Sequence, residues 1–256
     1  MSERFNEQFN EQQKEVLRLL KLLNDNNVLE HVVLVGSWSE YVYAMGGILP
    51  GFSANLRTID LDFLIKNQRR PTDPIDIPAL VKSENYSIAH DFLFGTTKFF
   101  SPGGLEVEFL IPKRGAGSET VLKTNLGVNA QSLWHMSAVI DNAITADVLG
   151  MKVQVPCPEI YVLTKMIIND VRPAAKQEKD ARSVQKLLPY LNYEKLDLLF
   201  DDLTKKEKGR VRAFIEKNGK MALELPLETR MEFAAFISKN MPEGKELSDK
   251  LSIDAR

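Results

Sequence analysis

Residues 58–65 read TIDLDFLI, and polar and apolar side chains alternate through the first part of this stretch. Alternation at every second position is typical of a β-strand with one polar face and one buried face. Asp60 and Asp62 therefore share one face, while Leu61 and Phe63 point to the other. Two neighbouring carboxylates repel each other, so this face predicts a bound counter-charge such as a divalent cation.

A second motif lies upstream, where residues 32–37 read VVLVGS. Four apolar residues closed by glycine predict a buried strand that runs into a turn. Ser37 and Glu40 have the spacing of a capping box, which predicts a helix that continues to about Met45. Gly36 would let a phosphate group approach the backbone, and the Ser37 hydroxyl could donate to it at the positive end of the helix dipole.

A third motif follows the Pro102-Gly103-Gly104 turn, where residues 105–111 read LEVEFLI. The turn predicts a hairpin between this strand and the β-rich stretch 86–100. Glu106 and Glu108 share one face of the strand, as the two aspartates do in theirs.

The rest of the pattern predicts a mixed α/β part followed by an all-helical part. We expect three regions: an N-terminal helix that packs on the core (1–29, helical over 5–24), the core (30–156) and a helical C-terminal domain (157–256). In the core we expect further strands at 133–139, 144–148 and 151–155. In the C-terminal domain we expect helices at 159–171, 176–191, 193–218 and 228–240.

Composition excludes several classes of protein. The chain has 256 residues, a net charge of −2 and a single cysteine, Cys157. One thiol cannot form an internal disulfide or a cysteine-rich zinc site, and the balanced charge argues against a uniformly basic nucleic-acid-coating surface. The polar N-terminus and the lack of a long apolar run predict a cytoplasmic protein with no membrane partner. Neither a P-loop motif nor a Gly-x-Gly-x-x-Gly fingerprint is present.

The order of the three motifs resembles the nucleotidyltransferase fold of the DNA polymerase β superfamily. In that superfamily an apolar strand, Gly-Gly/Ser and a helix precede Asp-x-Asp/Glu, and a later strand carries a third carboxylate. The resemblance implies an α/β (α+β) fold with a mixed-sheet core. It also implies that Asp60, Asp62 and Glu108 are catalytic and bind Mg²⁺ (or Mn²⁺), with Glu106 as the alternative to Glu108. Gly36 and Ser37 would bind the nucleotide phosphates.

The helical part adds a likeness to minimal nucleotidyltransferases and to the abortive-infection (AbiEii-type) toxins of toxin–antitoxin systems. The shared features are Arg57-Thr58 before the aspartates, a lysine on the first helix and a Lys/Arg-Asp pair on the next. By that similarity Lys165 would reach the triphosphate, and Asp180 would orient Lys165 or the nucleotide.

The function that follows is transfer of an NMP from an NTP to a hydroxyl acceptor, with release of pyrophosphate. The acceptor could be RNA, a protein or a small molecule. Seven basic residues within 205–220 favour a polyanionic acceptor if they form a free surface, although such a run is commonly a solvated helix face. The alternative function is a non-catalytic nucleotide-binding or toxin–antitoxin interaction module on the same fold.

Overall fold

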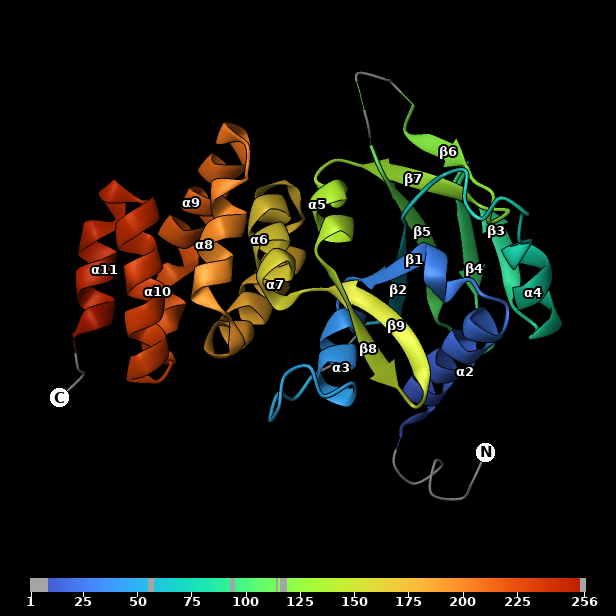
Figure 1. The fold of residues 1–256 in the computed structure, drawn as a ribbon, viewed down its shortest axis with the longest axis horizontal. Coiled ribbons are helices and arrows are strands. Elements are labelled where there is room, and N and C mark those ends of the chain that lie inside the picture. Colours follow the sequence, from blue (N-terminus) through green and yellow to red (C-terminus); the bar gives the residue numbers. More distant parts are fainter. Residues whose placement is uncertain (1–8, 55–57, 93–94, 114, 116–118, 254–256) are drawn as a thin grey trace. The chain divides into compact units, whose positions relative to one another are not determined.

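The computed structural model describes residues 9–54, 58–92, 95–113, 115 and 119–253. The chain divides into two compact units, Met1–Pro156 and Cys157–Arg256, and each is described by itself (Figure 1). The first unit combines a sheet with helices, and the described part of the second is helical. The expected mixed-sheet core followed by a helical C-terminal part is thereby confirmed.

The sheet of the first unit has the strand order β1-β2-β5-β4-β3, with β7 also beside β5 and β6 beside β7. The β2–β5 and β5–β7 pairs are parallel and the other pairs are antiparallel, so the sheet is mixed. The strands are β1 (Val32–Val35), β2 (Asp60–Ile65), β3 (Ser87–His90), β4 (Thr97–Phe100), β5 (Glu106–Pro112), β6 (Val121–Lys123) and β7 (Asn129–Leu133).

An aromatic cluster packs on one face of the three central strands. The Phe63 and Phe109 rings stack with centroids 5.6 Å apart, and the Phe99 ring meets Phe109 edge-on at 5.9 Å. All three rings are almost completely buried. Because side chains alternate along a strand, this packing commits the intervening residues of β2, β4 and β5 to the opposite face.

The described residues of the first unit also form four α-helices and a separate β-hairpin, which Figure 1 labels. These are α2 (Glu11–Asp25), α3 (Trp38–Met45), α4 (Ile77–Ser83), α5 (Met136–Asp141) and the hairpin of β8 (Ala143–Val148) with β9 (Met151–Pro156). The predicted N-terminal helix begins at Glu11, after an Asn10–Gln13 capping box, and residues 1–8 lie outside the described residues.

The predicted strand at 133–139 is wrong. Strand β7 ends at Leu133, and residues 136–141 form α5 instead. Trp134 and His135 form a turn after the strand, and His135, with a left-handed backbone (φ 70°), is the residue before the helix. Met136 and Val139, three positions apart, are the buried residues of α5, so the apolar spacing here is helical.

The second unit is a set of helices with short 3₁₀ turns between them. Its helices are α6 (Pro158–Ile168), α7 (Ala174–Leu187), α8 (Tyr193–Asp201), α9 (Lys205–Asn218), α10 (Leu227–Asn240) and α11 (Lys245–Ser252). The predicted helix 193–218 is two helices, because Thr204 and Glu207 form a capping box that begins α9. The sequence reading also missed α11.

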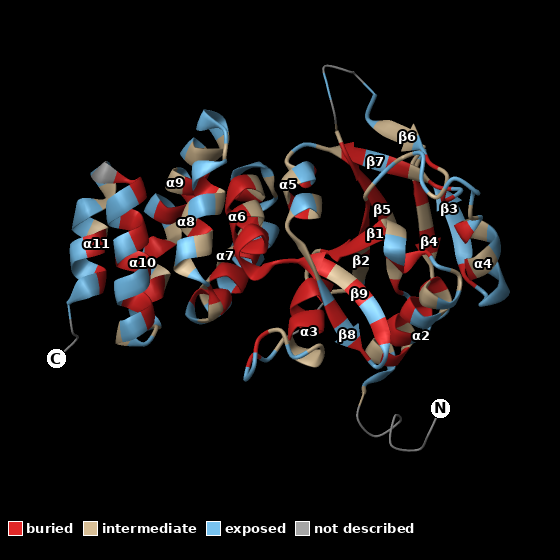
Figure 2. Cartoon of the chain, in the orientation of Figure 1, coloured by how far each residue is buried: buried red, intermediate tan, exposed pale blue. Residues whose placement is uncertain are grey.

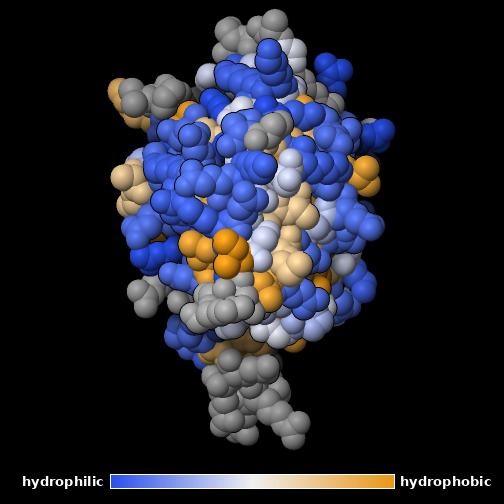
Figure 3. All heavy atoms as spheres, turned by 90° about the vertical axis from the view of Figure 1, so that its left-hand side faces the viewer, coloured by the Kyte–Doolittle hydropathy of each residue, from blue (hydrophilic) through white to orange (hydrophobic). Residues whose placement is uncertain are grey.

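Burial follows this division into elements. In Figure 2 the buried residues take up all of β1 and most of α6, whereas buried and exposed residues alternate along the other helices of the second unit. The end of the second unit that carries α11 has a largely hydrophilic surface with small apolar clusters (Figure 3). Within the described residues, none of the helices is both long enough and apolar enough to cross a membrane.

Candidate active site

Four carboxylates lie together on the face opposite the aromatic cluster. Asp60 is paired with Glu106 and Asp62 with Glu108 across the parallel strands β2 and β5. All four are half-buried, and paired positions on neighbouring strands lie about 5 Å apart. The structure therefore places the two predicted acidic pairs side by side, in matching register, as one carboxylate face.

Lys98 of β4 neutralises part of this face. It is paired with Glu108 across the antiparallel β4–β5 ladder. Its Nζ lies 2.7 Å from Glu106 Oε1 and also contacts Glu108 Oε1. Both glutamates thus share one ammonium group, through one oxygen each. These contacts raise the pKa of Lys98, with the Glu106 hydrogen bond as the largest cause, so the lysine stays charged.

The turn after β1 lies directly against the carboxylate face. Val35, the last residue of β1, is paired with Asp62. Gly36 follows with a φ of +72°, and a Cβ atom built on it would lie 2.7 Å from Asp62 Oδ2. A residue with a side chain would be strained there and would also displace the carboxylate. The predicted Gly36-Ser37 turn and the Asp60/Asp62 strand are therefore neighbours in space.

The start of α3 differs from the sequence prediction in its capping. Ser37 has a helical backbone, and its side chain makes no capping hydrogen bond, so the predicted capping box is absent. Instead the hydroxyl of Ser39 donates to the carbonyl of Leu34 at 3.0 Å, which fixes the helix to the end of β1. The half-buried Ser37 side chain is thus not used to begin the helix.

The residues present fit a divalent cation held by the aspartates. Magnesium usually takes one or two protein carboxylates and completes its shell with water and phosphate oxygens, and Asp60 with Asp62 supplies such a pair. Among the described residues, however, no group of three or more histidine, cysteine, aspartate or glutamate side chains is arranged to hold a metal ion. The contacts of Glu108 with Lys98 fit this finding, because they draw the third predicted carboxylate toward an ammonium group.

In the second unit the structure joins Lys165 of α6 to Asp180 of α7. Lys165 Nζ donates to Asp180 Oδ1 at 2.8 Å, and both side chains are buried. Arg172, just before α7, donates from Nη1 to both oxygens of Asp180 at 3.0 Å. Lys165 also lies over the ring of Tyr161, 5.4 Å from its centroid. Asp180 is therefore a buried carboxylate that holds two cations.

A comparison of the whole sequence identifies the family. Residues 14–208 match a family model described as Nucleotidyltransferase. The chain belongs to the nucleotidyltransferase family. The matched range takes in β1, β2 and β5 of the first unit and α6 and α7 of the second, so it contains every residue of the predicted site.

Two solved structures are similar to this nucleotidyltransferase. One is an antigenic nucleotidyltransferase-like protein from Paracoccidioides brasiliensis, at 16% identity, covering 83% of this chain and 90% of that chain, with a TM-score of 0.49. The other is the antibiotic-resistance factor ANT(2'')-Ia, at 13% identity, covering 83% of this chain and 96% of that chain, with a TM-score of 0.46. A search of curated proteins gave no match.

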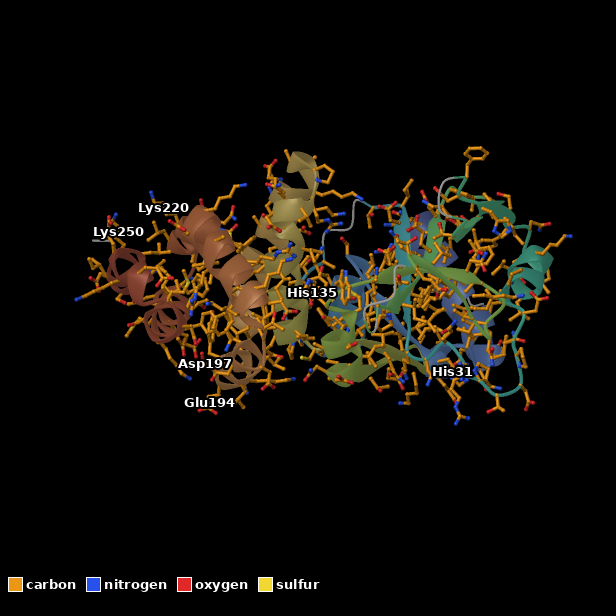
Figure 4. All side chains as sticks on the ribbon, turned by 90° about the horizontal axis from the view of Figure 1, so that it is seen from above. His31, His135, Glu194, Asp197, Lys220 and Lys250 are labelled. Atoms are coloured by element: carbon orange, nitrogen blue, oxygen red, sulfur yellow. The ribbon has the colours of Figure 1, made fainter. Side chains whose placement is uncertain are left out.

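The basic run of the nucleotidyltransferase is largely engaged within its own unit. Contacts within the unit are made by four of its residues: Lys208 with the Asp201 carbonyl, Arg210 with Asp170, Arg212 with the Asn240 carbonyl and Lys217 with Gln177. In the same unit the Asp197 carboxylate forms a salt bridge with Lys239. Figure 4 labels Asp197 and also Lys220, the last residue of the basic run. Most of the run thus serves the fold of the helices, as a solvated helix face commonly does.

Sequence reasoning missed two residues of these sites, Lys98 and Arg172. A signal for Lys98 was present, because a hairpin centred on Gly103 places position 98 opposite position 108. Arg172 lies in the short link between two helices, where no periodic pattern indicates which way a side chain points. Arg57 of the predicted motif lies outside the described residues.

Proposed function

We propose that this nucleotidyltransferase moves an NMP from an NTP to a hydroxyl acceptor, with release of pyrophosphate and dependence on Mg²⁺ or Mn²⁺. The observation that carries the proposal is the register of β2 and β5, which pairs Asp60 with Glu106 and Asp62 with Glu108. The close approach of Gly36 to Asp62 supports the proposal, because the turn that we expect to bind phosphate then lies beside the carboxylates.

Asp60 and Asp62 would hold the divalent cation. Bound there, the cation would neutralise phosphate charge and make the α-phosphorus a better electrophile. The half-buried position of the two carboxylates supports this role, because charges shielded from bulk water act more strongly on one another.

The turn at Gly36 and Ser37 would bind the β- and γ-phosphates. The positive end of a helix dipole favours anions, and the Ser37 hydroxyl is not used as a cap. The N–H groups of Ser39 and Glu40 donate to the carbonyls of Gly36 and Ser37, so the phosphates would be bound by the turn that precedes them. Lys165 would contact the triphosphate, with Asp180 and Arg172 fixing the position of its ammonium group. The likeness to minimal and abortive-infection nucleotidyltransferases rests on Arg57-Thr58, on Lys165 and on the Lys179-Asp180 pair.

In the reaction the acceptor oxygen would form a bond to the α-phosphorus while the bond to the bridging oxygen of the β-phosphate breaks. Pyrophosphate would leave with the bonding electron pair. The proton of the acceptor hydroxyl would pass to Glu108, which contacts Lys98 through Oε1. Glu106 occupies the equivalent position opposite Asp60 and is the alternative base.

The test is transfer of label from each α-³²P-NTP in turn by the purified full chain, with Mg²⁺ or Mn²⁺. Total RNA, a protein extract and a panel of hydroxylated small molecules are offered separately, which distinguishes the three classes of acceptor. We expect label on one class and release of pyrophosphate. Asp60→Asn/Asp62→Asn should reduce transfer by at least about a hundredfold, and Asp147→Asn, at an exposed side chain of the β8–β9 hairpin, should not.

Two results would overturn the proposal. Equal transfer by the wild type and the double variant would exclude the aspartates from the chemistry. Absence of transfer to every acceptor, combined with a rise in melting temperature on adding nucleotide, would support the non-catalytic binding module instead.

A further inference from the structure

Lys98 occupies a position in the carboxylate face that the proposed reaction does not use. The Asp60, Asp62, Glu106 and Glu108 side chains bring four negative charges to adjacent positions of two strands. Lys98 brings one positive charge to the glutamate side of this set. Its side chain and those of the two glutamates are about a quarter exposed, so water screens these charges only in part.

The position of Lys98 is fixed by the sheet. Its backbone pairs with Glu108, and Phe99 beside it is anchored in the aromatic cluster on the other face. Alternation then directs the Lys98 side chain to the carboxylate face. The fold therefore places the ammonium group between Glu106 and Glu108.

We propose that Lys98 is a positioning residue whose ammonium group takes the place of a metal ion between Glu106 and Glu108. Lys98 thereby restricts divalent-cation binding to Asp60 and Asp62 and lowers the affinity of that binding. A cation bound to the aspartates of β2 meets the like charge of Lys98, whose ammonium group lies on the glutamates of the neighbouring strand β5. This repulsion lowers the affinity of the cation. The same ammonium competes with the cation for Glu108. The inference rests on the proposed function only in placing the cation on the aspartates.

The test measures binding of Mn²⁺ alone to the full chain, by calorimetry and by the loss of the free-ion electron paramagnetic resonance signal. Lys98→Met removes the charge and keeps the stem of the side chain. The matched control is Lys152→Met, which also removes one lysine that is paired with a carboxylate, Asp147, but on the β8–β9 hairpin. Lys98→Arg keeps the charge and serves as the conservative variant.

We expect Lys98→Met to bind Mn²⁺ roughly tenfold more tightly than the wild type. Lys152→Met and Lys98→Arg should remain within about twofold of it. Adding Asp60→Asn to Lys98→Met should abolish the gain, because the cation then loses a ligand. If Lys98→Met does not fold, Lys98→Gln replaces it, since glutamine can still donate a hydrogen bond to the glutamates.

Three outcomes would overturn the inference: Mn²⁺ binding by Lys98→Met that is no tighter than by Lys152→Met, weaker binding by Lys98→Met, or no binding by any of the proteins. The transfer assay distinguishes this failure from that of the proposed function. Tighter Mn²⁺ binding without any nucleotide transfer would keep the role of Lys98 and reject the reaction. Transfer with unchanged Mn²⁺ affinity would do the reverse.

Discussion

The Cβ position of Gly36 lies 2.7 Å from Asp62 Oδ2, closer than a Cβ atom approaches another heavy atom in real proteins. The turn and the aspartate therefore fit together only while residue 36 has no side chain. The φ of +72° adds a second reason for glycine. Position 36 is thus the most sensitive point of contact between the β1 turn and the carboxylate face.

Gly36→Ala should impair both folding and transfer. We expect the free energy of unfolding in urea to fall by about 2–4 kcal/mol, from backbone strain and the displaced carboxylate, and transfer to fall at least tenfold. Gly150→Ala is the control, because Gly150 also has a positive φ (+84°) but nothing lies within 4 Å of its Cβ position. Equal losses of stability and activity in the two variants would mean that the contact with Asp62 is unimportant.

Two tyrosines of α3 should respond in opposite ways to loss of the hydroxyl. Tyr43 donates to the Pro156 carbonyl at 2.8 Å, whereas the buried Tyr41 hydroxyl has no hydrogen-bond partner among the described residues. Tyr43→Phe should lower the free energy of unfolding by about 1–3 kcal/mol, and Tyr41→Phe should leave it unchanged or raise it by about 1 kcal/mol. Urea unfolding at pH 7 measures both. A large loss in Tyr41→Phe would reveal a partner for its hydroxyl.

Stability should fall in alkali. Burial raises the pKa of Tyr41, Tyr86 and Tyr193 above the ordinary value near 10, and it also raises the pKa of the Cys157 thiol. The folded state therefore holds protons that the unfolded state releases, so this stability is complete below about pH 8.5 and is lost as pH rises toward the folded pKa values. Urea unfolding from pH 8 to 10.5 should show a progressive decline.

The slope of that decline tests its cause. Each tyrosine that is kept neutral only in the folded state contributes up to about 1.4 kcal/mol per pH unit above pH 10. Tyr41→Phe should reduce the slope by one such contribution. A slope that stays the same in Tyr41→Phe would show that the buried tyrosines do not govern the decline.

Asp180→Asn should strongly destabilise the protein. It would leave the buried Lys165 ammonium without its carboxylate partner and would weaken the hold on Arg172. We expect a loss of about 3–5 kcal/mol. The variant Lys165→Met/Asp180→Leu should recover much of that loss, because no buried charge then remains unpaired, and it should still lack transfer if Lys165 binds the triphosphate.

The control for this pair is Asp147→Asn, which breaks the exposed pair with Lys152. We expect its effect on unfolding to lie within about 1 kcal/mol. If Lys165→Met/Asp180→Leu loses as much stability as Asp180→Asn does, then Asp180 stabilises the fold through its contact with Arg172 alone.

Much of the carboxylate face could be predicted from sequence because it depends on local alternation. The faces of Asp60 with Asp62 and of Glu106 with Glu108 follow from two-residue periodicity, and both strands are confirmed. Their parallel register could not be read, because it depends on pairing between distant segments and not on a turn. The position of Lys98, in contrast, follows from the hairpin turn at 102–104. It could have been predicted from the sequence, but it was not.

Other errors arose where two local rules competed. Ser37 and Glu40 have capping-box spacing, but the Ser39 hydroxyl and a helical backbone at Ser37 begin the helix in another way. A continuous apolar pattern suggested one helix over 193–218, and the capping box at Thr204 and Glu207 overrides it. In both places apolar or polar spacing alone did not decide which residue begins the helix.

The parallel pairing of β2 with β5 also orders events during synthesis. Because Asp60 pairs with Glu106, the carboxylate face cannot form until the ribosome has added the whole crossover between the two strands. At about 5–20 residues per second, a nascent chain carries its aspartates for several seconds before their partners and Lys98 exist. Contacts so distant along the chain also form slowly. A newly made molecule should therefore complete its carboxylate face, where we propose that the cation binds, late in the folding of the first unit.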